Sequence, residues 1–169
     1  MIAILDTETT GLPSDPNARV IEVGAVVLHP HRDYAEVNSF TAVIHPGPEA
    51  LDGYPRNAAQ QVPVEAVLGA ESASVVRRAL YEWMEQHQVT EVFSYNRSFA
   101  EAMLKRSGFE LPWTGCVMRL ARGAMPGLKK DPSLAAAAAH FGLATVEAHR
   151  ALPDARLAAQ VFAAIRRRK

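Results

Sequence analysis

Three apolar segments near the start of the chain limit its possible folds most strongly. Ile2–Leu5, Val20–Leu28 and Ser39–Ile44 are rich in β-branched residues, and Glu22 is the one charged residue in the second segment. Short apolar runs of this composition indicate buried strands. Strands that follow one another over short connections usually pair antiparallel. The first third of the chain therefore predicts an antiparallel meander.

The remainder of the chain predicts helices with one more strand between them. The segments expected from apolar periodicity and capping residues are Ala73–His87 (helix, capped by Ser72), Val89–Ser94 (strand), Ser98–Ser107 (helix), 133–142 (helix, capped by Ser133) and a last helix from Pro153. This order predicts an α/β fold with a mixed central sheet flanked by helices. The length predicts a single domain covering residues 1–169.

Two segments have no regular pattern. Four prolines and two glycines interrupt Pro46–Pro63, which is expected to form a long loop. Pro112–Lys130 is expected to be irregular, apart from one turn of helix around Met118–Ala121.

Charge and cysteine content exclude several classes of protein. Eighteen basic and eighteen acidic residues give no net charge, so a nucleic acid would have to be held by local positive charge or bound cations. Cys116 is the only cysteine, which excludes an intramolecular disulfide and a cysteine-rich zinc site. No run approaches the roughly 20 apolar residues that cross a bilayer. We expect no membrane partner and a cytoplasmic location.

Carboxylates stand at two positions where they could hold a metal ion. Strand alternation places Asp6 and Glu8 on the same face, where two acids repel each other unless a cation neutralises them. Oxygen ligands of this kind suit Mg²⁺ or Mn²⁺. Asp154 lies in the first turn of the last helix, five residues after His149. Each position also has an ordinary interpretation, as a solvent-exposed strand end or as an acid that suits the helix dipole.

Together these residues resemble the motifs of a known superfamily. Asp6–Gly11 is similar to the first motif of the DEDDh (DnaQ-like) 3′→5′ exonucleases, and His149–Ala155 to their last motif. Val20–Val26 is similar to their second strand. Cys116–Arg122 is particularly similar to exodeoxyribonuclease X, a member of that superfamily. The resemblance implies an RNase H-like fold and hydrolysis of phosphodiester bonds at the 3′ ends of nucleic acids. DNA is the favoured substrate, but the sequence leaves the choice between DNA and RNA open.

The resemblance also implies the roles of the motif residues. Two Mg²⁺ or Mn²⁺ ions are expected, with Asp6, Glu8 and Asp154 as their ligands and His149 as the general base. The expected substrate contacts are Thr9, Gly11, Leu12, Asn96 and Phe99.

The middle motif departs from the family pattern at its metal ligand. Tyr95–Ala100 matches at Asn96 and Phe99, but Ala100 stands where the family has an aspartate, so the second ion should bind weakly. The substitution could be engineered, or natural in a crippled exonuclease or a non-catalytic nucleic-acid-binding module. Alternatively, Glu101 could replace the missing ligand.

Local positive charge and partners complete the expectations. Arg119 and Arg122 are candidate phosphate contacts, with an ordinary surface role as the alternative. A polymerase partner or a dimer stays open, as does the choice between single and double strands. Hydrolysis of small phosphoesters is a third possible activity on the same fold.

Overall fold

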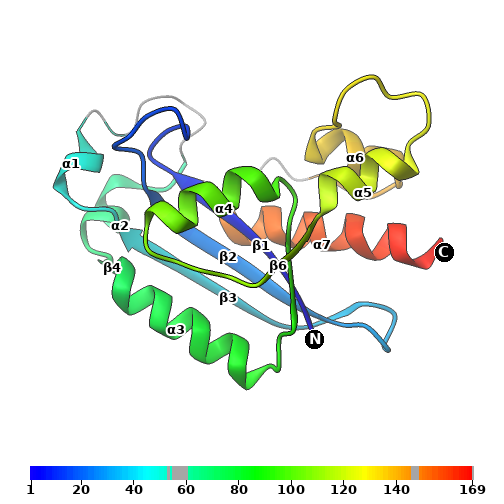
Figure 1. Cartoon of the computed structure of the whole chain (residues 1–169), viewed down its shortest axis with the longest axis horizontal. Helices are drawn as coiled ribbons and strands as arrows, with labels where there is room; N and C mark the ends of the chain where they lie inside the picture. The colour runs from blue at the N-terminus through cyan, green and yellow to red at the C-terminus, as the bar shows by residue number, and fades with distance from the viewer. Residues whose placement is uncertain (53, 55–60, 146–148, 169) are drawn as a thin grey trace.

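A six-stranded mixed sheet forms the centre of the protein. The computed structural model describes residues 1–52, 54, 61–145 and 149–168, and Figure 1 shows its strands in the order β4-β3-β2-β1-β5-β6. The strands are β1 Ile2–Thr9, β2 Val20–His29, β3 Ala35–His45, β4 Glu71–Ser72, β5 Glu91–Ser94 and β6 Trp113–Cys116. The first three pair antiparallel, which confirms the predicted meander, whereas β5 runs parallel to β1. The predicted α/β class and mixed sheet are confirmed.

Helices cover both faces of this sheet (Figure 1). They are α1 Pro48–Leu51, α2 Val64–Leu68, α3 Ala73–Gln86, α4 Arg97–Arg106, α5 Val117–Ala124, α6 Leu134–His140 and α7 Ala151–Arg167. One core lies between the sheet and α5, α6 and α7. The second core lies between the opposite face and α3 and α4.

β1 is buried on both faces, which explains its continuous apolar run. Ile2 and Ile4 pack in the core beneath α7, whereas Ala3 and Leu5 pack in the core beneath α3 and α4. Side chains alternate along a strand, so Asp6 continues the row of Ile2 and Ile4 and faces α7. The strand thereby carries an acidic residue from its apolar part towards the first turn of α7.

The segment predicted to be irregular is the main error of the sequence-based fold. Pro112–Lys130 contains strand β6 and the two-turn helix α5, where only one turn around Met118–Ala121 was expected. β6 forms because it pairs in parallel with β5, and Gly115 allows this approach: a Cβ there would overlap the ring of Phe93. This pairing comes from tertiary contacts rather than from the local sequence.

Smaller differences concern loops and helix ends. Within the expected loop 46–63 the structure contains α1, while positions 53 and 55–60 lie outside the described residues. Ser133 caps α6 as predicted, because its hydroxyl accepts a hydrogen bond from the Ala136 amide at 3.1 Å. Ser72 occupies the predicted N-cap of α3, but its hydroxyl pairs with that of Ser74. α7 begins at Ala151, so Pro153 lies within its first turn, where helical amides have no intrahelical partner.

Candidate active site

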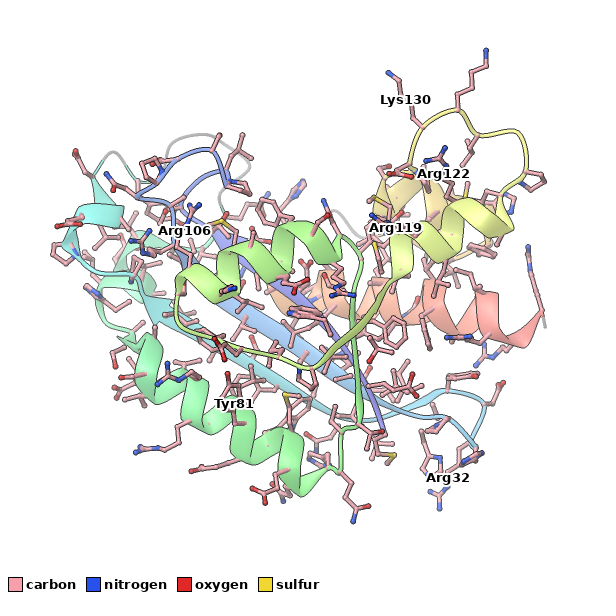
Figure 2. All side chains as sticks on the ribbon, in the orientation of Figure 1. Arg32, Tyr81, Arg106, Arg119, Arg122 and Lys130 are labelled. Carbon is pink, nitrogen blue, oxygen red and sulfur yellow. The ribbon has the colours of Figure 1, made fainter. Side chains whose placement is uncertain are left out.

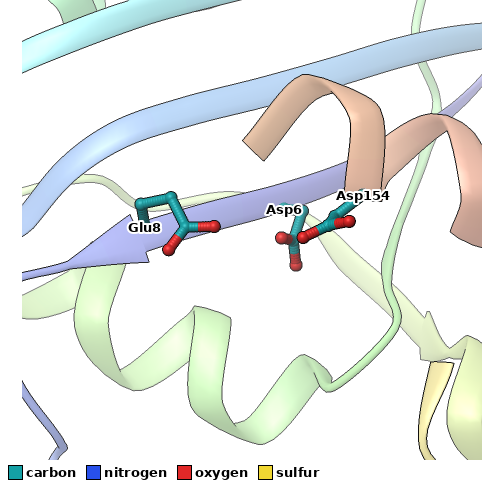
Figure 3. A group of neighbouring side chains, drawn as sticks. All are labelled: Asp6, Glu8 and Asp154. Carbon is teal, nitrogen blue, oxygen red and sulfur yellow. The ribbon is translucent and has the colours of Figure 1, made fainter. Parts of the chain in front are cut away.

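Three carboxylates from opposite ends of the chain meet at the C-terminal half of β1. Figure 3 shows Asp6 and Glu8 on this strand and Asp154 on the first turn of α7. One ligand oxygen from each side chain lies within 4.8 Å of the others, and all three side chains are partly buried. The structure thus brings together the three acids for which the sequence predicts a metal-ligand role.

The pKa values of this group show the cost of holding three acids together. Burial is the main cause of a strong rise in the pKa of Asp6, and the charges of Glu8 and Asp154 raise it further. Burial, followed by the charge of Asp154, raises the pKa of Glu8 to about 7. Burial also raises the pKa of Asp154. A divalent cation would reverse these shifts, because it favours the ionised form of each ligand.

The donor set fits a hard divalent cation. All three groups offer carboxylate oxygens, the ligand type that Mg²⁺ and Mn²⁺ prefer, and no sulfur or nitrogen ligand belongs to the group. The three acids, with ligand oxygens within 4.8 Å of one another, also carry more negative charge when ionised than the neighbouring Arg150 can balance. The residues of the site are therefore suited to bind a hard divalent cation.

His149 lies beside Asp154, although it does not belong to the group of metal-ligand candidates. Its charge opposes the rise in the pKa of Asp154, and its side chain is exposed. The residue has a φ of 38°, in the left-handed region that non-glycine residues rarely adopt. An exposed histidine next to a ligand carboxylate can exchange protons with solvent and with a bound substrate.

Ala100 lies in the first turn of α4 and is almost fully buried, with 2% of its surface exposed. Asn96 caps this helix by accepting a hydrogen bond from the amide of Phe99 at 3.4 Å. Phe99 packs against the core beneath α3 and α4. Among the described residues, α4 adds no acid to the group. The carboxylate of Glu101 accepts a hydrogen bond from Arg97 at 2.9 Å and remains outside it.

The predicted substrate-binding loop follows β1. The Thr9 hydroxyl donates to the carbonyl of Gly11 at 2.8 Å, and Leu12 is 66% exposed. Arg106 at the end of α4 donates to the carbonyls of Pro13 and Asp15 at 2.9 and 2.6 Å. This clamp holds the loop that presents an apolar side chain to solvent.

The predicted phosphate contacts differ in their surroundings. Figure 2 shows Arg119 and Arg122 on α5. Arg119 lines a cavity of about 510 Å³ between α4, β6 and α5, which Arg97 and Cys116 also line. Arg122 instead forms an ion pair with Asp131 at 3.0 Å. Arg119 is therefore the better placed of the two to meet a ligand near α4.

Sequence reasoning missed a fourth acid next to the group. Glu22 is 2% exposed and lies opposite Glu8 in the β1–β2 register. Its carboxylate forms an ion pair with Arg150 and accepts a hydrogen bond from the Ala151 amide at 3.0 Å. The available signal was a lone acid in an otherwise apolar strand. Tyr54 also lies close, since burial and the charges of Glu8 and Glu22 raise the pKa of its phenol.

The fold matches solved nuclease structures along nearly its whole length. Exonuclease X in complex with 5′-overhanging duplex DNA is 24% identical, with a TM-score of 0.74, over 100% of this chain and 93% of that one. The nuclease domain of 3′hExo, a DEDDh family member bound to rAMP, is 16% identical, with a TM-score of 0.75, over 99% and 92%. A sheet of this order with acids on its central strand defines a domain of RNase H-like exonuclease fold.

A third similar structure is that of a nuclease that recognises an RNA. It is titled as 3′-end-specific recognition of a histone mRNA stem-loop by a 3′-exonuclease, and it is 14% identical with a TM-score of 0.75. The match covers 96% of this chain and 62% of that one. Comparison with curated proteins gives no match.

The family follows from the sequence itself. The model of the RNase T family, described as exonuclease, matches residues 3–162. The chain therefore belongs to this exonuclease family. Membership supports a nuclease function, and such nucleases generally use divalent metal ions. Within the part of the chain that the structure describes, none of the helices is long and apolar enough to cross a membrane.

Proposed function

We propose that this protein is a metal-dependent 3′→5′ exonuclease that hydrolyses phosphodiester bonds at DNA 3′ ends, with metal use weakened by Ala100. The observation that carries the proposal is the group of Asp6, Glu8 and Asp154, whose ligand oxygens lie within 4.8 Å of one another. Family membership supports the nuclease class. The 3′ polarity is supported by the resemblance of both terminal motifs to the DEDDh pattern, and the DNA substrate by the similarity of Cys116–Arg122 to exodeoxyribonuclease X.

The three acids would hold the metal ion, and His149 would move the proton. A bound divalent ion would lower the pKa of the water that it binds and would balance part of the negative charge of the phosphate. Asp6, Glu8 and Asp154 provide the oxygen ligands that keep such an ion at the end of β1. A neutral His149 would accept the proton of the attacking water on a ring nitrogen. Its exposure leaves that nitrogen accessible to a substrate-bound water.

The substrate would lie against the loop after β1 and the start of α4. Thr9, Gly11 and Leu12 would contact the terminal nucleotide, and the exposed Leu12 side chain offers apolar surface to a base. Asn96 and Phe99 would contribute to binding mainly by shaping the start of α4. Arg119 is the favoured phosphate contact, because it lines the cavity beside α4.

Ala100 would weaken the second metal ion and leave the first in place. Its methyl group cannot ligate a cation or order a metal-bound water, and Glu101 is held by Arg97 instead. The three remaining acids all belong to one compact group. We expect the protein to bind one ion at metal concentrations that would fill both sites of a complete active site. Hydrolysis should be slow as a result.

The direct test follows nucleotide release from single-stranded DNA labelled at its 3′ end, with Mg²⁺ and with Mn²⁺. Early appearance of labelled mononucleotide is expected, and the same strand labelled at its 5′ end should give a ladder of shortening products. The matching RNA strand measures the sugar preference. Absence of mononucleotide at high protein concentration, or release that Asp6→Asn leaves unchanged, would overturn the proposed activity.

The buried alanine in α4 favours one alternative, a non-catalytic nucleic-acid-binding module. Ala100→Asp separates the two functions. An exonuclease lacking one ligand should gain roughly tenfold or more in rate and bind a second Mn²⁺ in calorimetry. Ala102→Asp places the same charge on an exposed position of the same helix and should change neither quantity. No gain from Ala100→Asp, together with tight DNA binding, would favour the binding module.

A further inference from the structure

Two residues of β2 contact the start of α7, the helix that carries Asp154. Glu22 and Gly24 are two positions apart on this strand, so both face the same side of the sheet. In the β1–β2 register, Glu22 lies opposite Glu8 and Gly24 lies opposite Asp6. Both residues are therefore cross-strand neighbours of the two acids on β1.

Gly24 allows the backbone of α7 to lie directly on the strand. A Cβ added at this position would overlap the backbone of Ala151 and Leu152. Those atoms belong to the first turn of the helix and cannot move aside as the end of a flexible side chain could. Any side chain at position 24 would displace the start of α7 from β2.

Glu22 fixes the same turn through hydrogen bonds. Its two carboxylate oxygens, Oε1 and Oε2, accept hydrogen bonds from Arg150 Nε at 3.1 and 3.0 Å. Oε2 also accepts one from the Ala151 amide at 3.0 Å. The carbonyl of Arg150 in turn accepts from the Asp154 amide at 3.1 Å. A chain of contacts therefore leads from the buried Glu22 to the backbone of Asp154.

We propose that Glu22 and Gly24 are positioning residues that hold Asp154 against Asp6 and Glu8, and that they thereby set the affinity for the divalent ion. This inference rests on the proposed metal-dependent function. Ligand oxygens must lie within a few tenths of an ångström of the distances that a metal requires. A displaced first turn of α7 would leave Asp6 and Glu8 in place and remove the third ligand.

Gly24→Ala tests the proposal without changing any charge. We expect its affinity for Mn²⁺, measured by calorimetry, to fall by about tenfold or more, the scale reported for changes in residues that orient metal ligands. Gly123→Ala is the matched control, because a Cβ at Gly123 meets nothing within 4 Å. An unchanged affinity in a folded Gly24→Ala variant would overturn the role of Gly24.

Glu22→Gln tests the second contact, and a double variant separates position from charge. The single variant removes a negative charge near the site, whereas Glu22→Gln with Arg150→Met leaves the summed charge unchanged. If the contacts act by position, both variants should bind Mn²⁺ about tenfold more weakly. Recovery of affinity in the double variant would show a purely electrostatic effect and overturn the role of Glu22. The control is Glu36→Gln, which breaks another ion pair between the sheet and α7, with Arg156.

Hydrogen exchange reports on the helix without any metal. In metal-free protein we expect Glu22→Gln to speed amide exchange in residues 149–156 and to leave 157–167 protected. Uniform acceleration over all of α7 would instead indicate general destabilisation and overturn the positioning role. If the wild-type protein bound no Mn²⁺, the proposed function would be wrong, and exchange in 149–156 would still decide whether Glu22 holds the start of α7. Should Gly24→Ala fail to fold, the single and double variants at Glu22 still test whether the contacts of β2 hold the start of α7.

Discussion

His149 differs from the three acids in its exposure to solvent, and this difference separates its proposed role in proton transfer from the proposed binding of metal by the acids. The acids are partly buried and share one site, whereas His149 approaches Asp154 from outside. A substitution at His149 should therefore affect the chemical step while the metal site stays intact. The two functions of the site can be measured independently.

We expect His149→Ala to lower the rate of nucleotide release by about 10²-fold, the usual scale for loss of a general base. Mn²⁺ affinity should change little, because the ligand carboxylates remain. The comparison variant is His31→Ala, which changes an exposed histidine in the turn before β3. A loss of less than about threefold would mean that metal-bound hydroxide reacts without His149.

At the residue scale, the sequence predicts the candidate metal ligands better than the residues that position them. Asp6 and Glu8 could be paired by strand alternation, and Asp154 by its motif. The contact between Glu22 and Arg150 could not be predicted, because residues far apart in sequence meet only after β2 and α7 have packed. Glu101 is the opposite case, because its position next to Ala100 suggested a replacement ligand, whereas the structure pairs it with Arg97. That pairing depends on a rotamer that spacing alone does not determine.

The elements around the substrate loop suggest a further experiment. Arg106 on α4 holds the segment that presents Leu12, and the base of this loop is closed by Thr10 and Arg19, whose backbones pair at 2.9 Å. The loop therefore has a fixed base and one clamp near its tip. The clamp is the contact whose removal should act on substrate binding alone.

Arg106→Ala should raise the KM for an oligonucleotide roughly tenfold, because the loop that contacts the terminal nucleotide loses its fixed position. The affinity for Mn²⁺ should stay the same. Lys105→Ala removes a neighbouring exposed cation and controls for the general effect of charge on DNA binding. Equal losses in both variants would indicate that Arg106 acts through charge rather than through the loop.

At the element scale, periodic segments were predictable and pairing-dependent ones were not. β2 and α3 have apolar patterns that match their burial, so the predicted segments overlap the observed ones closely, whereas β1 continues past the predicted Ile2–Leu5 to Thr9. β6 has four residues, one of them glycine, and becomes a strand only beside β5. The start of α7 at Ala151 likewise depends on Glu22, which accepts from the amide of that residue.

At the scale of the whole molecule, the stability of the folded protein should depend on pH because three acids lie close together. The pKa of Glu8 rises from 4.5 to about 7, and those of Asp6 and Asp154 rise as well. A carboxyl group whose pKa is higher in the folded state stabilises that state at any pH below the pKa of the unfolded chain. This contribution is lost as the pH rises through the pKa of the folded state. The metal-free protein should therefore lose stability between about pH 4.5 and 7.

The expected loss, after allowance for solvent screening at a partly exposed site, is about 1–2 kcal/mol, which lowers the Tm by roughly 3–8 °C. Thermal unfolding at pH 5 and pH 8 in a chelator measures it. Glu8→Gln removes one titrating group and should flatten the difference. A metal-free protein with the higher Tm at pH 8, and a Glu8→Gln variant with the same profile, would contradict the raised pKa.

Bound metal should reverse this loss. At pH 8, Mn²⁺ at about 100 times its Kd should stabilise the folded protein by about 2.7 kcal/mol, or roughly 5–10 °C in Tm. Asp154→Asn removes one ligand and should abolish most of the increase. An equal increase in wild-type protein and in this variant would mean that Mn²⁺ binds elsewhere.

The distance in sequence between Asp6 and Asp154 also affects the protein during its synthesis. A ribosome that adds about 5–20 residues per second needs roughly 7–30 s to proceed from the first of these residues to the second. During that interval β1 can pair with β2 and β3, but the third ligand and the helix that covers this face have not yet been made. The nascent chain therefore cannot complete the proposed metal site, and we expect the proposed activity only after α7 has left the ribosome.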